Sequence, residues 1–180
     1  MERCDCAQYG LEGWHAVAGQ WGVEDIPDAP SGQRALVQRA TENACNVIVA
    51  PSGPYTAMDI SVRFKPMAGR EDAASGLIVH FAEGQYSRMR ANTLEDNVRL
   101  YAYDRGRHQL ATVRVSPSAL GQWHTIWVVA VGESIQASLN GALLLEHRDA
   151  RSAAGQVRPW TKADSMTGFD DLVIRGMLGT

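Results

Sequence analysis

Arginine, asparagine and tyrosine side chains alternate with apolar ones along the segment RANTLEDNVRLYAYDRG, residues 90–106. A four-residue loop in its middle predicts a β-hairpin in which Arg90 lies directly opposite Arg99. Two like charges in this arrangement destabilise a sheet by roughly a few tenths of a kcal/mol or more. We therefore expect an anion or a group with several hydrogen-bonding atoms between the two guanidinium groups, either Glu95 or Asp96 of the loop or a bound ligand.

The alternation continues upstream of this hairpin and divides three expected strands into two faces. A three-residue loop containing Gly84 would place His80 opposite Arg88, and Arg88 in turn faces Tyr101. One face is apolar and should form the core: Leu77, Val79, Phe81, Met89, Ala91, Val98, Leu100 and Ala102. The other is the candidate ligand-binding face: His80, Tyr86, Arg88, Arg90, Asn92, Asn97, Arg99, Tyr101 and Tyr103.

Two interpretations of this polar face are open. Guanidinium forks, amides and phenols together suit a polyhydroxylated or carboxylated ligand. The alternative is a solvated sheet face on which long side chains lie flat over apolar surface.

Strand patterns predominate in the rest of the chain. Period-2 alternation or short apolar runs occur at residues 58–64, 76–82, 86–92, 97–103, 108–115, 123–131, 134–140, 142–147 and 169–175. Turn residues separate these runs, and the dipeptide Asn140-Gly141 is a strong hairpin signal. Residues 31–44 are the one candidate helix. The sequence therefore predicts a single all-β domain over residues 1–180, either a sandwich or a barrel.

Composition excludes several classes of protein. A chain of 180 residues with 45% hydrophobic and 21% charged residues is typical of a globular domain. The net charge of -3 argues against nucleic acid or an anionic membrane as the main partner. No apolar run approaches the length of a membrane span, and the first ten residues contain no signal-peptide pattern. The three cysteines predict neither a disulfide framework nor a zinc site.

Several blocks of the sequence resemble a known family. GLIVHF, YSRMRANTLEDNVRLY, WHTIWV, LNG, WTKADS and FDDL are similar to the concanavalin A-like lectin and glucanase domains, in particular to the 3-keto-disaccharide hydrolase type, which is related to family-16 glycosidases. The resemblance implies a two-sheet antiparallel β-sandwich, a jelly roll of the concanavalin A-like or laminin G-like kind. It also implies a concave sheet that serves carbohydrate and an extracytoplasmic location, periplasmic or secreted.

Three functions follow as expectations. The first is a carbohydrate-interacting domain that binds a sugar on the polar face. The second is a glycoside hydrolase of the 3-keto-disaccharide type, and the third is a structural or self-associating domain, for example a homo-oligomer. The segment WTKADS is expected to form a rigid loop anchored by Trp160, and its Lys162 and Asp164 complete the set of candidate ligand-binding residues.

Catalytic and metal-binding motifs are weak. Family-16 glucanases carry two glutamates around an aspartate on one strand, and this chain has no such run. If the domain is a hydrolase, the candidate acids are Glu95, Asp96, Asp164, Asp170 and Asp171. No cofactor is expected. Asp170 should point inward, where it either accepts hydrogen bonds from backbone amides or Lys162, or binds a structural calcium ion.

Trp127 departs from the pattern of the family. Strand alternation places it on the face opposite Ile126 and Val128. It is an exposed stacking platform, part of a subunit interface, or packed beneath the N-terminal segment, and of these we expect the packing.

Overall fold

The computed structural model describes residues 2–4, 11–116, 119–150 and 153–179. The part of the chain that it describes contains strands and no helix. The strands are β1 (Glu2–Cys4), β2 (His15–Ala18), β3 (Trp21–Asp25), β4 (Arg34–Gln38), β5 (Cys45–Val49), β6 (Tyr55–Ala68), β7 (Ala74–Ala82), β8 (Gln85–Asn92), β9 (Asn97–Tyr103), β10 (Arg107–Arg114), β11 (His124–Val131), β12 (Ser134–Leu139), β13 (Ala142–Arg148), β14 (Gln156–Lys162) and β15 (Met166–Leu178).

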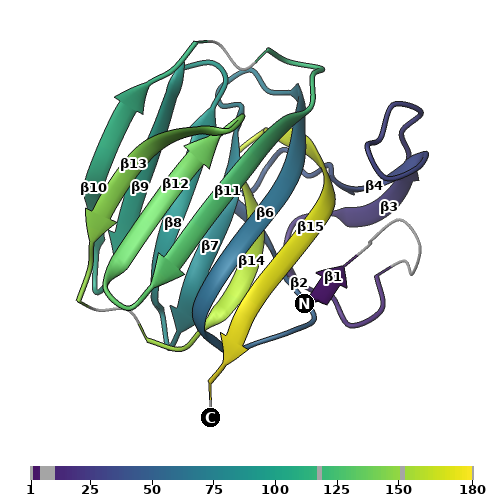
Figure 1. Cartoon of the computed structure of the whole chain (residues 1–180). Helices are drawn as coiled ribbons and strands as arrows, with labels where there is room; N and C mark the ends of the chain where they lie inside the picture. The colour runs from purple at the N-terminus through teal and green to yellow at the C-terminus, as the bar shows by residue number, and fades with distance from the viewer. Residues whose placement is uncertain (1, 5–10, 117–118, 151–152, 180) are drawn as a thin grey trace.

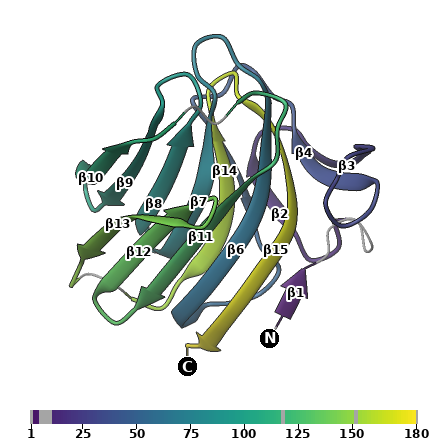
Figure 2. The ribbon, with the colours of Figure 1, turned by 45° about the horizontal axis from the view of Figure 1, so that its top comes forward.

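These strands form two antiparallel sheets that lie face to face (Figure 1). The eight-stranded sheet has the order β13-β12-β11-β6-β15-β4-β3, with β1 paired to β15 beside this path. The seven-stranded sheet has the order β10-β9-β8-β7-β14-β5-β2. Figure 2 shows the two layers from another angle, with β6 and β15 in one and β7 and β14 in the other. The predicted all-β sandwich is confirmed.

The core lies between the sheets. Leu77, Met89 and Leu100 of the seven-stranded sheet are at most 1% exposed, as the alternation of the sequence predicts. They belong to one apolar cluster with residues such as Ile60 and Ile126 of the other sheet. Burial of each such side chain contributes about 1.5 to 3 kcal/mol to stability, so the core holds the two sheets together.

The hairpin of β8 and β9 has the register that the sequence predicts. Arg90 pairs with Arg99, Arg88 with Tyr101, and the pairs on either side follow. Loop length and alternation agree here, and a slip by one residue would move every apolar side chain out of the core.

The predicted register of β7 against β8 is wrong. Arg88 lies opposite Ile78 rather than His80, because the turn after Ala82 has two residues and the ladder shifts between Val79 and Ala82. His80 itself has a φ of 55°. An extra residue of this kind is a β-bulge, and it reverses the direction of the side chains that follow.

The bulge exchanges the faces of two neighbouring side chains. Phe81, predicted in the core, lies on the outer face, where its ring stacks on that of Tyr86 with 5.4 Å between centroids. His80, predicted on the outer face, is 4% exposed and lines a cavity together with Ser87 and Ala102, whose side chains point between the sheets.

The prediction of a helix at residues 31–44 is also wrong. Residues Arg34–Gln38 form β4, which lies between β3 and β15. Its consecutive residues Ala35, Leu36 and Val37 are all 0% exposed. Periodicity alone cannot distinguish a short apolar run of this kind from a helical segment.

Asp170 is buried, with 1% exposure, and its carboxylate is hydrogen-bonded. It accepts bonds from the backbone N–H groups of Ser31 at 2.8 Å and Asp171 at 2.8 Å, and from the Ser31 hydroxyl at 2.6 Å. The prediction of backbone amide donors is confirmed, whereas Lys162 contacts a different carboxylate. No group of three His, Cys, Asp or Glu side chains suited to a metal ion occurs among the described residues; the calcium ion stays a prediction.

Trp127 is not buried beneath the N-terminal residues that the structure describes. Its side chain is 45% exposed on the outer face of the eight-stranded sheet, and its Nε1 donates a 2.6 Å hydrogen bond to Asp59. Within the described residues, no helix has the length and apolar character needed to cross a membrane.

Candidate ligand-binding face

The outer face of the seven-stranded sheet carries most of the predicted site residues. We call it the arginine face and define it by Phe81, Tyr86, Arg88, Arg90, Arg99, Tyr101, Tyr103, Arg158, Trp160 and Lys162. Strands β7, β8, β9 and β14 lie side by side and position these side chains (Figure 1). Although this face points away from the other sheet, several of its side chains are nearly inaccessible, including Arg90 at 4% and Trp160 at 0% exposure. The face is therefore a packed layer.

Glu95 is the anion between the paired arginines. Its Oε1 lies 2.7 Å from Nη2 of Arg90, and its Oε2 lies 3.2 Å from Nη2 of Arg99. Asn97 donates a further hydrogen bond to Oε2 at 3.0 Å. Of the alternatives that the sequence left open, the structure therefore shows the carboxylate of the adjacent loop. Asp96 instead adopts a φ of 51° in the turn.

The hydrogen bonds to Glu95 affect the acidity of this carboxyl group. The bond from Asn97, followed by the bond from Arg90, lowers the pKa of Glu95 below its usual value despite partial burial. Tyr101 accepts a 3.4 Å bond from each of Arg90 and Arg99. Burial would raise the pKa of Tyr101, but these two guanidinium groups lower it overall. The charges of this cluster are thus mutually stabilised.

Asp72 extends the network to the other end of Arg90. Its side chain is 4% exposed, and its Oδ1 lies 3.6 Å from Nη2 of Arg90 and accepts a 2.9 Å bond from Asn92. Its Oδ2 pairs with Nζ of Lys162. Asp72 is not predictable from the sequence, since a single carboxylate in a loop before a strand carries no motif.

Asp164 holds the loop that presents Asp72. Its carboxylate accepts hydrogen bonds from the backbone N–H groups of Arg70 at 2.6 Å, Glu71 at 3.2 Å and Asp72 at 3.0 Å. Chiefly through the bond from Arg70, these amides lower the pKa of Asp164. The segment expected to be a loop is in part the end of β14, which continues to Lys162. Asp164 thus has a positioning contact, while Lys162 reaches the arginine face.

Arg88 lies among three aromatic rings. Its Cζ is 4.1 Å from the centroid of the Trp160 ring, 4.6 Å from that of Tyr103 and 5.6 Å from that of Tyr101. Each such cation–π contact contributes about 0.5 to 2 kcal/mol, more where water is excluded. Arg88 also donates a hydrogen bond to the Tyr103 hydroxyl. Its guanidinium group is therefore held in one orientation.

Trp160 lies beneath the guanidinium group of Arg88. Its Nε1 donates a 3.1 Å hydrogen bond to the carbonyl of Met89. A Cβ on Gly76 would stand 2.1 Å from that same carbonyl oxygen and 3.3 Å from Nε1. Glycine at position 76 therefore allows the close approach of the indole, and Trp160 fills space as an anchor.

A second aromatic row adjoins the first. The rings of Tyr86 and Tyr103 stack with 4.4 Å between centroids, and Phe81 continues the row. The guanidinium group of Arg158 covers Phe81, with Cζ 3.3 Å from the ring centroid. The bulge in β7 brings Phe81 here, where strand alternation does not predict it. Arg158 of β14 carries no motif that predicts its place beside Phe81.

The arginine face opens into a hollow beside β10. The hollow has a volume of about 560 Å³ and is lined by Glu95, Asn97, Arg99, Thr112 and Arg114. Nε of Arg99 and Oδ1 of Asn97 are buried at its edge without a hydrogen-bond partner among the described residues. The hollow combines fixed charges with open space.

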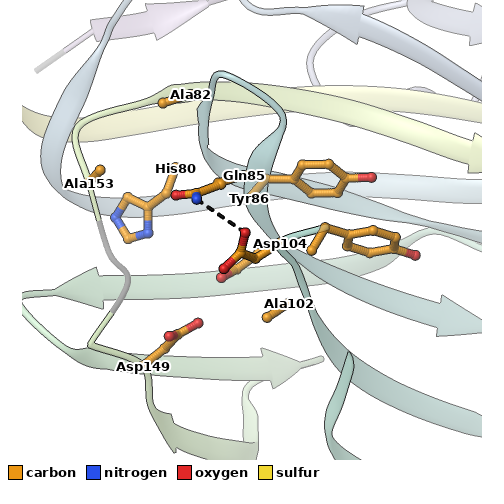
Figure 3. A pocket seen from close by; sticks show the side chains of 10 residues that line it. His80, Ala82, Gln85, Tyr86, Ala102, Asp104, Asp149 and Ala153 are labelled. Carbon is orange, nitrogen blue, oxygen red and sulfur yellow. Dashed lines mark hydrogen bonds between the residues drawn. The ribbon is translucent and has the colours of Figure 1, made fainter. Parts of the chain in front are cut away.

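A second, small cavity lies beside His80, and Tyr86 and Tyr103 of the arginine face contribute to its lining. It has a volume of about 20 Å³, enough for about one water molecule. Figure 3 shows His80, Asp104 and Asp149 around it, with a 3.2 Å hydrogen bond from Gln85 to Asp104. Both ring nitrogens of His80 are buried without a hydrogen-bond partner among the described residues. Burial lowers the pKa of His80, while the charge of Asp149 opposes this shift.

His80 should make stability depend on pH. Because its pKa in the folded chain lies below the ordinary value of about 6.5, the unfolded chain binds a proton that the folded chain does not. We therefore expect the free energy of unfolding to fall below pH 6.5, by at most about 1.4 kcal/mol per pH unit, until the pKa of the folded state is reached. Urea unfolding at pH 7.5, 6 and 5 measures this.

His80→Asn is the matched variant, because asparagine tolerates a positive φ. This variant should make the free energy of unfolding less dependent on pH between pH 7.5 and 5. An equally steep profile in the variant would show that another group is responsible.

Comparison with known proteins gives the fold. No family model matches the sequence, and no curated protein is significantly similar to it. The carbohydrate-binding module CBM66 from Bacillus subtilis has a TM-score of 0.76 at 16% identity, over 91% of this chain and 96% of the module. A second Bacillus subtilis protein, with a galectin-like fold, has a TM-score of 0.69 at 13% identity, over 99% and 100% of the two chains.

A third solved structure carries a sugar. It is domain 4 of AbnA, a GH43 extracellular arabinanase from Geobacillus stearothermophilus, in complex with arabinotriose. Its TM-score is 0.60 at 13% identity, over 99% of this chain and 96% of that one. At such identities the likeness establishes architecture: this chain is a jelly-roll β-sandwich of the kind found in carbohydrate-binding modules and galectin-like domains.

Proposed function

We propose that the chain is a carbohydrate-binding domain and that its ligand lies on the arginine face. The observation that carries the proposal is the cluster of Arg90, Glu95 and Arg99 beside Arg88 and its aromatic rings. Two of the similar structures are described as a carbohydrate-binding module and as a sugar complex. These descriptions support carbohydrate as the class of ligand.

The chemistry of the face suits a sugar. Hydrogen bonds from charged groups to hydroxyl oxygens contribute about 1.5 to 3 kcal/mol each, and ring faces pack against apolar sugar surfaces. The side chains of Arg99, Glu95 and Lys162 are 30%, 41% and 42% exposed, so a ligand can reach them. Beneath them the buried network of Arg90 and Asp72 holds the donors in place. A ligand therefore meets a preorganised surface, which reduces the entropy lost on binding.

Hydrolysis, including the 3-keto-disaccharide type, is the alternative. It requires a carboxyl group that keeps its proton, hence a raised pKa, as general acid. Glu95 and Asp164 both have lowered pKa values and accept several hydrogen bonds. Neither of these two carboxyl groups therefore fits the role of the general acid.

A glycan array followed by titration calorimetry tests the proposal. We expect the double variant Arg88→Met/Arg99→Met to bind its sugar at least about tenfold more weakly, equivalent to ~1.4 kcal/mol. Trp127→Ala is the control, because it removes an exposed aromatic ring from the opposite surface of the sandwich.

The outcomes separate the three functions. Unchanged binding in the double variant, or loss of binding in Trp127→Ala, would contradict the proposed face. Release of reducing sugar by the unaltered chain, abolished in Glu95→Gln, would favour hydrolysis. Sedimentation at several concentrations, with no sugar bound in any assay, would reveal a self-associating domain.

A further inference from the structure

We propose that the sugar is acidic and that its carboxylate lies in the hollow between Arg99 and Arg114. This inference rests on the proposed function and adds the substrate class. It depends on the distribution of charge, on the partners of each charged group, and on the carboxylate of Glu95, which already bridges two arginines of this face.

The charge of the arginine face is opposite to that of the whole chain. Seven cationic side chains lie on the face and in its hollow: Arg88, Arg90, Arg99, Arg107, Arg114, Arg158 and Lys162. The carboxylates that pair with them are Asp72 and Glu95. The chain as a whole has a net charge of -3. The surplus of positive charge is thus local, and it favours an anionic ligand.

The partners of the two carboxylates are known. Asp72 pairs with Lys162 and Arg90, and Glu95 pairs with Arg90 and Arg99. The guanidinium group of Arg114 is exposed and has no ion-pair or hydrogen-bond partner among the residues that the structure describes. The hollow therefore contains a cation whose charge is not neutralised within the described part of the chain.

The register places Arg114 and Arg99 as diagonal neighbours. Arg114 pairs with Asn97 and Thr112 pairs with Arg99, so the two arginines are offset by two residues on adjacent strands. Diagonal neighbours lie about 7 to 8 Å apart at the backbone, within reach of long side chains. Both arginines line the same hollow. One carboxylate between them would contact both guanidinium groups.

Glu95 shows how such a carboxylate binds. It bridges Arg90 and Arg99 with one oxygen to each, at 2.7 and 3.2 Å, and Asn97 donates to it as well. The ligand carboxylate would occupy the corresponding place on the far side of Arg99, with the hydroxyl of Thr112 beside it. Planar carboxylates match guanidinium forks in two-point contacts, so a uronic acid suits the site. The volume of about 560 Å³ is in the range of small-ligand sites.

The test is an array of oligogalacturonate, oligoglucuronate and oligomannuronate, their methyl esters, a sulfated galactan, and neutral oligosaccharides. Methyl esters keep the sugar and remove the charge. We expect one or more of the free acids to bind at least tenfold more tightly than its ester. We also expect the preference for the acid over its ester to decline as the salt concentration rises from 50 to 500 mM. Over this range the Debye length falls from about 14 to about 4 Å.

Arg114→Gln should weaken binding of the acid about tenfold and binding of the ester by a smaller factor, because the uncharged ester loses at most a hydrogen bond. Arg175→Gln is the matched control: it removes the same charge from β15 of the other sheet and should change neither. If the acid and its ester bind equally well, or if only the neutral oligosaccharides bind, the inference is overturned and the proposed function stands. Binding of the sulfated galactan without the uronates would also overturn it. No binding by any member would overturn both.

Discussion

Replacing Arg90 by leucine should lower the free energy of unfolding by about 3 to 5 kcal/mol. Arg90 is 4% exposed and lies between Asp72 and Glu95. Its removal leaves the buried carboxylate of Asp72 with Lys162 as its remaining ion-pair partner. An uncompensated buried charge is far more destabilising than the loss of an exposed ion pair. Urea unfolding followed by circular dichroism measures the change.

Arg99→Leu provides the comparison. Arg99 shares Glu95 and Tyr101 with Arg90, but its side chain is 30% exposed, so we expect a loss of no more than about 1 kcal/mol. The double variant Asp72→Asn/Arg90→Leu should recover part of the stability, because it also removes the buried negative charge. Equal losses for the two single variants, or no recovery in the double variant, would show that burial of charge is not the dominant effect.

Replacing Trp160 by alanine should lower the free energy of unfolding by about 3 to 5 kcal/mol. The indole is completely buried on the outer side of the sheet, and its deletion leaves a cavity over Gly76. The variant also loses the hydrogen bond to Met89 and the ring nearest the guanidinium group of Arg88. The loss is again measured by urea unfolding.

Trp127→Ala is the matched control for this second variant. It removes the same side chain from a site that is 45% exposed, and we expect a change of at most about 1 kcal/mol. Sugar binding should fall in Trp160→Ala even under conditions where the variant is folded, since Arg88 is no longer oriented. If both tryptophan variants lose the same stability, Trp160 is not the anchor of the arginine face.

The two large effects have one structural cause. No helix among the described residues covers the outer face of the seven-stranded sheet, and its own long side chains cover it instead. Arg88 covers Trp160 and Arg158 covers Phe81, while Arg90 lies between two carboxylates. The layer that presents ligand-binding groups is thus also part of what stabilises the sheet.

Local patterns in the sequence were sufficient to predict part of the candidate site. Strand alternation and a four-residue loop predicted that Arg90 lies opposite Arg99, and the pairing is confirmed. The same reasoning required an anion between them and named Glu95 as one candidate. These inferences succeeded because all the residues concerned lie within one hairpin, where the length of the loop determines the register.

The wrong predictions concern positions whose structure is not determined by the residues nearby in the sequence. The bulge that moves His80 inward and Phe81 outward depends on a positive φ at a non-glycine residue, which alternation does not reveal. The strand β4 was taken for a helix because a run buried on both sides has no period.

The order of residues alone predicts the all-β class, the apolar inner faces and the hairpin that pairs two arginines. These depend on alternation and turn chemistry, which act between residues close in the chain. The contact of Asp72 with Lys162, 90 residues away, and the position of Trp160 beneath Arg88 are seen only in the folded chain. Such contacts arise when β14 inserts between β5 and β7, and the order of strands in a sheet is set by the packing of the whole core.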